Sequence, residues 1–244
     1  MPAKLFIISA PPKYELISIK GMEALKECDV VLYDRLIDKK LLTLTNAKKI
    51  YVGKTPYSKH TNQQQINELI ERYLKEGLKV ARLKGGDVAF FSRVKEEVDI
   101  AKSLSAQVEW ISGVTSASIM CEKLKMPLTS RNVSNGVIFI TGHDKEYNIK
   151  NCYDWESIVK LNMTVVIYMG IKNLSTISKL LIKYGMDKET PVAIGMSLGF
   201  DDERFVFFKL DEVDRYSDTL SSPAIVVIGD IVNYSYLKEE LYGK

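Results

Sequence analysis

Hydrophobic positions in the first half of the chain alternate between short apolar runs and stretches with helical spacing. Lys4–Ile8 is a mainly apolar run that predicts a strand, whereas the apolar positions within Ile19–Glu27 recur on one helix face. A second helix is predicted over Gln63–Glu76, with Gly77 marking its end. Further strands are predicted at Asp29–Tyr33, Lys49–Val52, Lys79–Leu83 and Gln107–Ile111, and further helices at Val94–Leu104 and Ser116–Leu124. This alternation predicts a mostly parallel sheet covered by helices.

The second half has a different pattern, because its strands follow one another with less helix between them. One helix is predicted over Ile171–Tyr184. Strands are predicted at Gly136–Thr141, Met163–Tyr168, Pro191–Met196, Arg204–Lys209 and Pro223–Gly229. This succession favours a mixed sheet with antiparallel pairs.

The change of pattern predicts two α/β domains of similar size. The break falls near Met126–Val133, so we expect an N-terminal domain over residues 1–130 and a C-terminal domain over residues 131–244. Two domains of this kind commonly bind a ligand in the cleft between them.

The composition is that of a folded globular protein. Of 244 residues, 46% are hydrophobic and 27% are charged, which is too apolar for a disordered chain. Lysine and arginine exceed aspartate and glutamate by 34 − 31 = 3, so the charge argues against a protein whose whole surface binds nucleic acid. No apolar stretch approaches the length of a membrane helix, and we expect no membrane association.

The three cysteines Cys28, Cys121 and Cys152 lie far apart in the sequence and form no CxxC pair. A zinc ribbon or a thioredoxin-type redox site is therefore not expected, nor is any metal. The start of the sequence lacks a basic and then apolar leader. We expect free thiols and a cytoplasmic location.

Two catalytic motifs are matched only in part. Gly53-Lys54-Thr55 resembles the end of a phosphate-binding loop, but Lys48 replaces the first glycine that the motif needs. Gly195–Gly199 matches GxSxG, but a strand is predicted after it instead of a helix, and both histidines precede it. Nucleotide hydrolysis and serine-hydrolase chemistry are therefore not predicted. GxGxxG and HExxH do not occur.

Four polar or glycine-rich segments follow predicted strands of the first half. The glycines of Leu83–Asp87 allow close approach of a ligand to the backbone, although the same residues suit a tight turn. The carboxyl ends of parallel strands meet at one edge of a sheet, so we expect these segments to converge on a binding site. The four segments are Val31–Leu36, Tyr51–Lys54, Leu83–Asp87 and Gly113–Ala117.

These segments resemble those of the tetrapyrrole methylases, and the resemblance covers nearly the whole chain. Each match is short, but nine occur in the order of the family. Besides the four segments above, they are Pro127–Arg131, Thr141–His143, Tyr168–Gly170, Thr190–Ala193 and Ser222–Gly229. The resemblance implies an S-adenosyl-L-methionine-dependent enzyme, usually a homodimer, with the cofactor in the cleft between two α/β domains. S-adenosyl-L-homocysteine would be its product.

The resemblance also implies functional residues. Asp34 and Lys54 match acid/base positions, although Asp34 could instead cap a helix or pair with Arg35. The implied substrate, uroporphyrinogen III, is rich in carboxylates, and its binding residues would be Arg35, His60, Arg93 and Arg131; His60 fits a surface loop equally well, and His143 a structural role. Cofactor contacts are implied at Pro11, Gly85, Gly86, Asp87, Phe90, Thr115, Ser116, Met169, Ala193, Leu198 and Ala224.

Two segments depart from the family pattern. Where relatives have GAGPGDPELL after the first strand, this chain has Ser9–Leu16 without the glycines, and Val88–Arg93 replaces PFxFGR. The expected activity is the conversion of uroporphyrinogen III to precorrin-2. Two alternatives stay open: methylation of another tetrapyrrole or of a diphthine precursor, and a non-catalytic protein that binds a tetrapyrrole or the cofactor.

Overall fold

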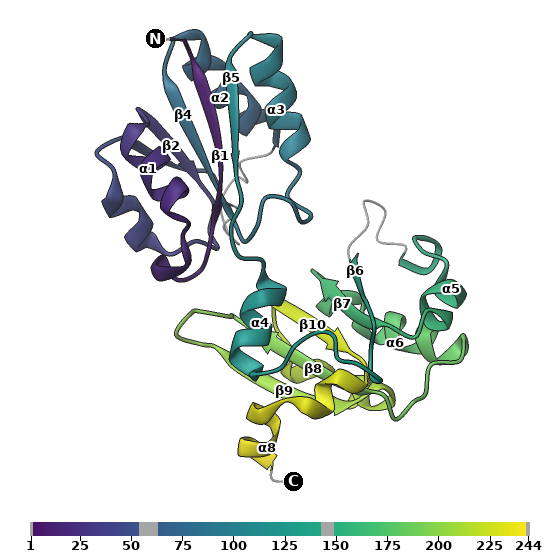
Figure 1. The fold of residues 1–244 in the computed structure, drawn as a ribbon. Coiled ribbons are helices and arrows are strands. Elements are labelled where there is room, and N and C mark those ends of the chain that lie inside the picture. The colour runs from purple at the N-terminus through teal and green to yellow at the C-terminus, as the bar shows by residue number, and fades with distance from the viewer. Residues whose placement is uncertain (1, 54–62, 143–148, 243–244) are drawn as a thin grey trace. The chain divides into compact units, whose positions relative to one another are not determined.

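The computed structural model describes residues 2–53, 63–142 and 149–242. The chain forms two compact units, Met1–Thr115 and Ser116–Lys244 (Figure 1). The units divide earlier along the chain than the expected boundary between residues 130 and 131, because the helix that begins at Ser116 packs on the sheet of the second unit.

The first unit contains a five-stranded parallel sheet in the order β3-β2-β4-β1-β5. Ala10 pairs with Gly85 and Tyr33 with Leu83, so strands β1, β2 and β4 end at one edge of the sheet. The parallel arrangement confirms the prediction. The strands are β1 (Lys4–Ala10), β2 (Val30–Tyr33), β3 (Lys48–Tyr51), β4 (Lys79–Gly85) and β5 (Gln107–Ile111).

Helices cover both faces of this sheet, as the continuous apolar strands require. Helices α2 (Gln63–Lys75) and α3 (Val94–Ser103) pack on the face that carries Leu5 and Ile7. Helix α1 (Ile19–Glu27) packs on the opposite face with the 3₁₀ segment Lys39–Leu44. A shorter 3₁₀ segment spans Tyr14–Leu16.

The second unit contains a mixed five-stranded sheet in the order β6-β7-β10-β8-β9. Only β6 and β7 pair in parallel, whereas β10 is antiparallel to both β7 and β8, and β8 to β9. This confirms the predicted mixed sheet. The strands are β6 (Val137–Thr141), β7 (Thr164–Tyr168), β8 (Pro191–Met196), β9 (Arg204–Lys209) and β10 (Ala224–Ile228).

Short helices pack on the second sheet. Side chains of α5, α6 and α7 share one hydrophobic core with alternate residues of the strands, including Ile167 and Val226. Helix α4 lies against the sheet at Gly195, where an added Cβ would approach Met120 Sδ to 2.6 Å. The helices are α4 (Ser116–Leu124), α5 (Trp155–Lys160), α6 (Leu174–Lys183), α7 (Val213–Tyr216) and α8 (Tyr236–Tyr242), and 3₁₀ segments span Ile149–Asn151, Ile171–Asn173, Leu210–Glu212, Ser217–Thr219 and Asp230–Tyr234.

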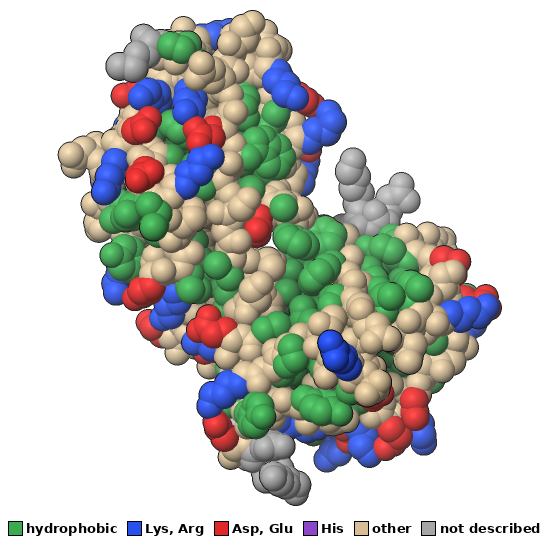
Figure 2. Space-filling view, viewed as in Figure 1, with side chains coloured by type: hydrophobic (Ala, Val, Ile, Leu, Met, Phe, Trp, Pro, Cys, Tyr) green, Lys and Arg blue, Asp and Glu red, His purple; other side chains and the backbone are tan. Residues whose placement is uncertain are grey.

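Side chains of both charge signs are spread over the surface (Figure 2), and the three cysteines are free thiols. On the face drawn in Figure 2, acidic and basic side chains are interspersed, in keeping with a net charge of +3. The three cysteines form no disulfide, and burial raises the pKa values of Cys28 and Cys121. Within the described residues, no helix is long and apolar enough to cross a membrane.

Candidate active site

The segments after the strands of the first sheet contact one another at its carboxyl edge. Gly86 N–H donates to the carbonyl of Ala10 at 2.9 Å, which joins the ends of β4 and β1. Asp38 N–H donates to the carbonyl of Pro11 at 3.2 Å, which joins the segments after β2 and β1. The segment after β3 also takes part, because a Cβ added at Gly53 would lie 2.7 Å from the Arg35 amide nitrogen. The predicted convergence of these segments is therefore observed.

Two glycines at the end of β4 give this edge an accessible backbone. Gly86 has a φ of +81°, and a Cβ added there would meet no atom within 4 Å. Gly85 packs against Leu36, whose carbonyl oxygen would lie 3.0 Å from an added Cβ. Asp87 shapes the following turn, because its Oδ1 accepts a hydrogen bond from Ala89 N–H at 2.8 Å. The open space at Gly86 fits close approach by a ligand such as the expected cofactor.

The end of β1 and the segment after it are bonded into the fold despite the missing glycines. Ser9 is buried, and its Oγ accepts a hydrogen bond from Val88 N–H at 3.0 Å. A Cβ added at Gly113, which follows β5, would lie 2.4 Å from Ser9 Cβ, so glycine is required there for the two backbones to approach. Pro11 is buried, and Thr115 ends the first unit.

Asp34 follows β2 and is held by an arginine that sequence reasoning missed. Its Oδ1 accepts a hydrogen bond from Arg82 Nη2 at 2.6 Å, and its side chain is 30% exposed. The sequence interpretation offered Arg35 as the ion-pair partner, but Arg35 is exposed and the structure pairs Asp34 with Arg82. Lys54 and His60 lie outside the described residues.

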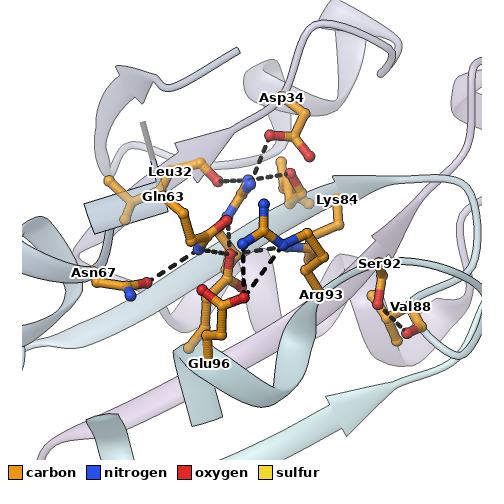
Figure 3. A network of polar contacts seen from close by, with 12 residues as sticks. Leu32, Asp34, Gln63, Asn67, Lys84, Val88, Ser92, Arg93 and Glu96 are labelled. Atoms are coloured by element: carbon orange, nitrogen blue, oxygen red, sulfur yellow. Dashed lines mark hydrogen bonds and ion pairs between the residues drawn. The ribbon is translucent and has the colours of Figure 1, made fainter. Parts of the chain in front are cut away.

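A buried cluster of charges lies beneath Asp34. Glu97 is fully buried, and its Oε1 accepts hydrogen bonds from Arg82 Nε at 3.2 Å, Lys84 Nζ at 2.8 Å and Gln63 Nε2 at 3.2 Å. Burial lowers the pKa of Lys84 and Arg82 lowers it further, partly opposed by Glu97. Figure 3 shows these contacts converging between Asp34, Lys84 and Gln63.

The second unit presents another group of predicted residues at one end of its sheet. Met169 follows β7 and Leu198 follows β8, while Ala224 begins β10 opposite Met196. Met169 has a φ of +53° and a side chain that is 52% exposed. Leu198 also packs toward Gly195, whose added Cβ would lie 2.7 Å from Leu198 Cδ2. The structure thus brings Met169, Leu198 and Ala224 to the same end of the sheet.

The remaining cofactor candidates differ in burial. Ala193 lies within β8 and is fully buried. Ser116 is the first residue of α4, one turn before Met120, and Phe90 is half-buried. The segments after β6 and β7 touch, since a Cβ on Gly142 would clash with Gly170 Cα at 2.2 Å. His143, the next residue, lies outside the described residues.

The arginines predicted to bind the substrate are not brought together as closely as the residues above. Arg93 is exposed at the start of α3 and forms an ion pair with Glu96 at 2.7 Å. Arg131 is exposed in the turn between Ser130 and Ser134. Ser134 Oγ accepts a hydrogen bond from Thr164 N–H at 2.9 Å, so this turn lies at the start of β7, and Met169 follows its end. At a rise of ~3.3 Å per residue, Thr164 and Tyr168 at the two ends of β7 are ~13 Å apart.

A cavity of about 630 Å³ lies at the same end of the second sheet as Arg131. Its lining includes Ser134, Thr164 and Asp230, and it excludes Met169, Leu198 and Ala224. The predicted cofactor residues of this unit therefore do not line it. Among the described residues, no group of three or more histidine, cysteine, aspartate or glutamate side chains could hold a metal ion.

The geometry around Ser197 agrees with the rejection of hydrolase chemistry. Ser197 Oγ donates to Asp202 Oδ2 at 2.8 Å, and the residue is buried. Strand β8 continues through a turn into β9, whereas a nucleophile elbow is followed by a helix. Ser197 thus stabilises the turn.

Comparisons with known proteins indicate the family of this chain. The tetrapyrrole (corrin/porphyrin) methylase family model matches residues 4–214. A uroporphyrinogen-III C-methyltransferase of Bacillus subtilis (strain 168) is 38% identical over 94% of this chain, and this chain covers 48% of it. A second protein of that description and organism is 35% identical over 97% of this chain and 93% of its own length. The chain thus spans about half the length of some curated relatives and nearly all of others.

A solved structure shows the same fold. Uroporphyrin-III C-methyl transferase from Thermus thermophilus, complexed with S-adenosyl homocysteine, has a TM-score of 0.81 and 31% sequence identity. The match covers 95% of this chain and 99% of that one. The fold and the sequence similarity therefore indicate the methyltransferase class. The chain belongs to the tetrapyrrole (corrin/porphyrin) methylase family.

Proposed function

We propose that this protein transfers methyl groups from S-adenosyl-L-methionine to uroporphyrinogen III and forms precorrin-2 through precorrin-1. The observation that carries the proposal is the similarity, over nearly the whole length of both chains, to proteins described as uroporphyrinogen-III C-methyltransferases. The carboxyl edge of the first sheet supports it, because Asp34 and an accessible glycine backbone lie there together.

Residues of each unit are proposed to contact S-adenosyl-L-methionine. The cofactor supplies a methyl group on a positively charged sulfur and leaves as S-adenosyl-L-homocysteine. The open backbone at Gly86 admits a ligand at close range, and Met169 offers an exposed apolar surface. Ala224, at the start of β10, is proposed as a further contact. Pro11, Phe90, Thr115 and Ser116 would complete the contacts in this proposal.

In each methylation, a pyrrole carbon of the substrate donates an electron pair to the methyl carbon. A carbon–carbon bond forms, the sulfur–carbon bond breaks with its electron pair remaining on sulfur, and the methylated ring later loses a proton. The protein contributes alignment of the two reactants and exclusion of water. Asp34 is proposed to accept the proton and Lys54 to assist as its acid/base partner.

Arginine side chains are proposed to bind the substrate carboxylates. Arg35 and Arg93 are exposed on segments that follow β2 and β4. Arginine can form two parallel hydrogen bonds with one carboxylate. Arg131 and His60 complete the proposed set.

The proposal is tested by supplying the purified protein with S-adenosyl-L-methionine and anaerobically prepared uroporphyrinogen III. The expected result is transfer of two methyl groups per tetrapyrrole and the absorbance of the oxidised product. Transfer only to a later corrin intermediate or to a diphthine precursor would support a different member of the family. Tight binding of the tetrapyrrole without transfer would support a non-catalytic binding protein. The hydrogen bond between Ser9 and Val88 argues against this alternative, because it indicates that the altered segment is still held in a defined conformation.

The proposal includes a homodimer in the cytoplasm. Sedimentation of the purified protein at micromolar concentration tests the dimer. The expected mass is twice the 27.7 kDa of the single chain.

A further inference from the structure

Arg82 lies in the interior of the first sheet, where arginine is seldom found. Its side chain is only 3% exposed. Arg82 pairs in register with Leu32 of β2, and Asp34 lies two residues further along the chain. Because side chains alternate between the faces of a strand, Arg82 and Asp34 share the face of the sheet covered by α2 and α3.

All three nitrogens of the Arg82 guanidinium group have hydrogen-bond acceptors. Nη1 donates to the carbonyl of Leu83 at 2.9 Å and to that of Leu32 at 3.4 Å. Nε donates to Glu97 Oε1 at 3.2 Å, and Nη2 donates to Asp34 Oδ1 at 2.6 Å. A planar guanidinium group held at several points can take only one orientation, so the direction of Nη2 is fixed.

Glu97 fixes Arg82 from the helix side. It lies in the first turn of α3, and the same oxygen that binds Arg82 also binds Lys84 and Gln63. Gln63 is itself held by Asn67 Oδ1 at 3.0 Å. The guanidinium group is thus bonded to groups of β2, β4 and α3, and Glu97 links it to Gln63 of α2.

Asp34 is the member of this hydrogen-bonded cluster that is exposed to solvent. Its carboxylate is 30% exposed, whereas Arg82 and Glu97 are buried beneath it. Arg82 binds one carboxylate oxygen from below. This leaves the carboxylate in a fixed orientation at the sheet edge, where the proposed substrate would lie.

We infer that Arg82, fixed by Glu97, is a positioning residue that orients Asp34 for proton transfer. The inference rests on the proposed function. Arg82 itself touches neither substrate nor cofactor in this scheme, so its whole effect on turnover passes through Asp34. An arginine that served only to stabilise the fold would affect turnover in the same proportion with or without the Asp34 carboxylate.

The test is a double-mutant cycle with methyl transfer to uroporphyrinogen III as the readout. The four proteins are the unaltered chain, Arg82→Gln, Asp34→Asn and the double variant. We expect Arg82→Gln to lower kcat at least about tenfold while KM changes by less than about threefold. In the Asp34→Asn background, the same substitution should lower kcat by less than about twofold, because the group it orients is gone.

Two additional variants separate positioning from folding. Arg72→Gln removes an exposed arginine of α2, with 57% of its side chain accessible, and should leave kcat unchanged in both backgrounds. If Arg82→Gln does not fold, Arg82→Lys keeps the charge but cannot reach the same four acceptors. It should show a smaller loss of kcat with the same dependence on Asp34. S-adenosyl-L-homocysteine titration counts the folded sites in every preparation.

The outcomes distinguish the inference from the function on which it rests. If Arg82→Gln or Arg82→Lys lowers kcat by the same factor in both backgrounds, the positioning role is wrong and the proposed function stands. If the unaltered protein transfers no methyl group to uroporphyrinogen III, the proposed function fails and the inference falls with it. If the Arg82 substitution lowers kcat only in the protein that keeps Asp34, the result supports both the positioning role and the proposed function.

Discussion

At the residue scale, two aspartates in one segment separate a catalytic role from a structural one. The side chain of Asp34 is partly exposed to solvent and is paired with the buried Arg82. Asp38 instead accepts hydrogen bonds from the amides of Lys40 and Tyr14 at 2.9 and 2.8 Å. We predict that Asp34→Asn lowers turnover by roughly 10²–10⁴, the range of a positioned acid/base, with little change in cofactor affinity.

Asp38→Asn is the matched control. It should reduce stability by about 1 kcal/mol, because an NH2 group replaces one of the two oxygens that accept from backbone amides, and leave turnover per folded molecule near normal. Methyl-transfer rates and melting temperatures of both variants decide between the roles. An Asp34→Asn protein that keeps more than about a tenth of its rate contradicts the acid/base role.

Gly86 offers a second test at this scale. The effect of its positive φ on stability can be separated from the effect of its open surroundings on ligand binding. We predict that Gly86→Val weakens S-adenosyl-L-homocysteine binding more than about tenfold, because a side chain would occupy the space proposed for the ligand. Calorimetric titration measures the affinity.

Gly77 supplies the control for backbone strain. It has a φ of +79° and, like Gly86, no atom within 4 Å of an added Cβ, but it lies at the end of α2. Both valine variants should lose roughly 1–3 kcal/mol of stability from the left-handed conformation. Only Gly86→Val should lose affinity, and equal affinities would remove Gly86 from the site.

At the scale of elements, the end of β1 has a side-chain hydrogen bond from Ser9 where the family pattern has a glycine-rich loop. Removing the Ser9 hydroxyl leaves the Val88 amide without its partner, which costs about 1–3 kcal/mol for a buried group. We predict that Ser9→Gly lowers both the melting temperature and the affinity for S-adenosyl-L-homocysteine. Ser9→Ala, which keeps the Cβ beside Gly113, should lose less. Tighter binding by Ser9→Gly would show instead that the departure from the family pattern weakens the site.

The edge strand β5 gives the first unit an acid-sensitive contact. Hydrogen bonds from Lys20 of α1 and Lys4 of β1 lower the pKa of Glu109 below its ordinary value of 4.5. A carboxyl group with a lowered pKa stabilises the fold above its unfolded pKa, and the contribution is lost as the pH falls through the folded pKa. We predict that Glu109→Gln reduces stability by less than about 1 kcal/mol at neutral pH, since these side chains are partly exposed. The difference from the unaltered protein should begin to shrink below pH 4.5 and disappear once the pH has fallen through the folded pKa, which denaturation over a series from pH 7 to about pH 2 measures. A difference that stays constant across this series would exclude the charge as its cause.

Elements with clear apolar periodicity were predictable from the sequence, and short ones were not. The helix Ile19–Glu27 and the strand Gln107–Ile111 have their predicted bounds. Helix α6 begins at Leu174 instead of Ile171 because the intervening residues form a 3₁₀ turn. Helices α5 and α7 are too short to show a period and were missed, although Asp154 caps α5 by accepting from Ser157 N–H at 3.1 Å.

The arrangement of the candidate site was predictable where it depends on strand ends and not where it depends on buried charge. Parallel pairing of β1, β2 and β4 is enough to bring the segments that contain Asp34 and Gly86 to one edge of the sheet. The partner of Asp34 was missed because Arg82 and Lys84 were treated as ordinary strand residues. Two cations spaced two apart in an otherwise apolar strand lie on one buried face, and they require a buried acid such as Glu97. That spacing is a signal that could have found the cluster.

At the scale of the whole molecule, each unit has its own hydrophobic core and its own tryptophan. Trp110 lies on β5, and the buried Trp155 begins α5. Ile7 and Ile167 are fully buried in the first and second cores. We predict that Ile7→Ala, at a cost of about 2–5 kcal/mol, shifts the denaturation midpoint reported by Trp110 more than that reported by Trp155. Ile167→Ala should have the opposite effect.

Single-tryptophan proteins carrying Trp110→Phe or Trp155→Phe make the two signals separable. Each isoleucine variant is compared with its parent in the same background. Equal shifts of both signals for either substitution would show that the two units unfold as one cooperative body, contrary to this prediction.

The central position of β1 in the first sheet has a consequence for biosynthesis. Lys4 pairs with Lys79 on one side and with Gln107 on the other, so the strand is made 103 residues before its second neighbour. At ~5–20 residues per second, a ribosome needs roughly 5–20 s to supply that partner. Until Lys79 has been made, Leu5–Ile8 is an apolar segment without either of its neighbouring strands, and it lacks β5 for the whole interval. We therefore expect the nascent chain to rely on ribosome-associated chaperones, or on slow aggregation, until β5 has emerged.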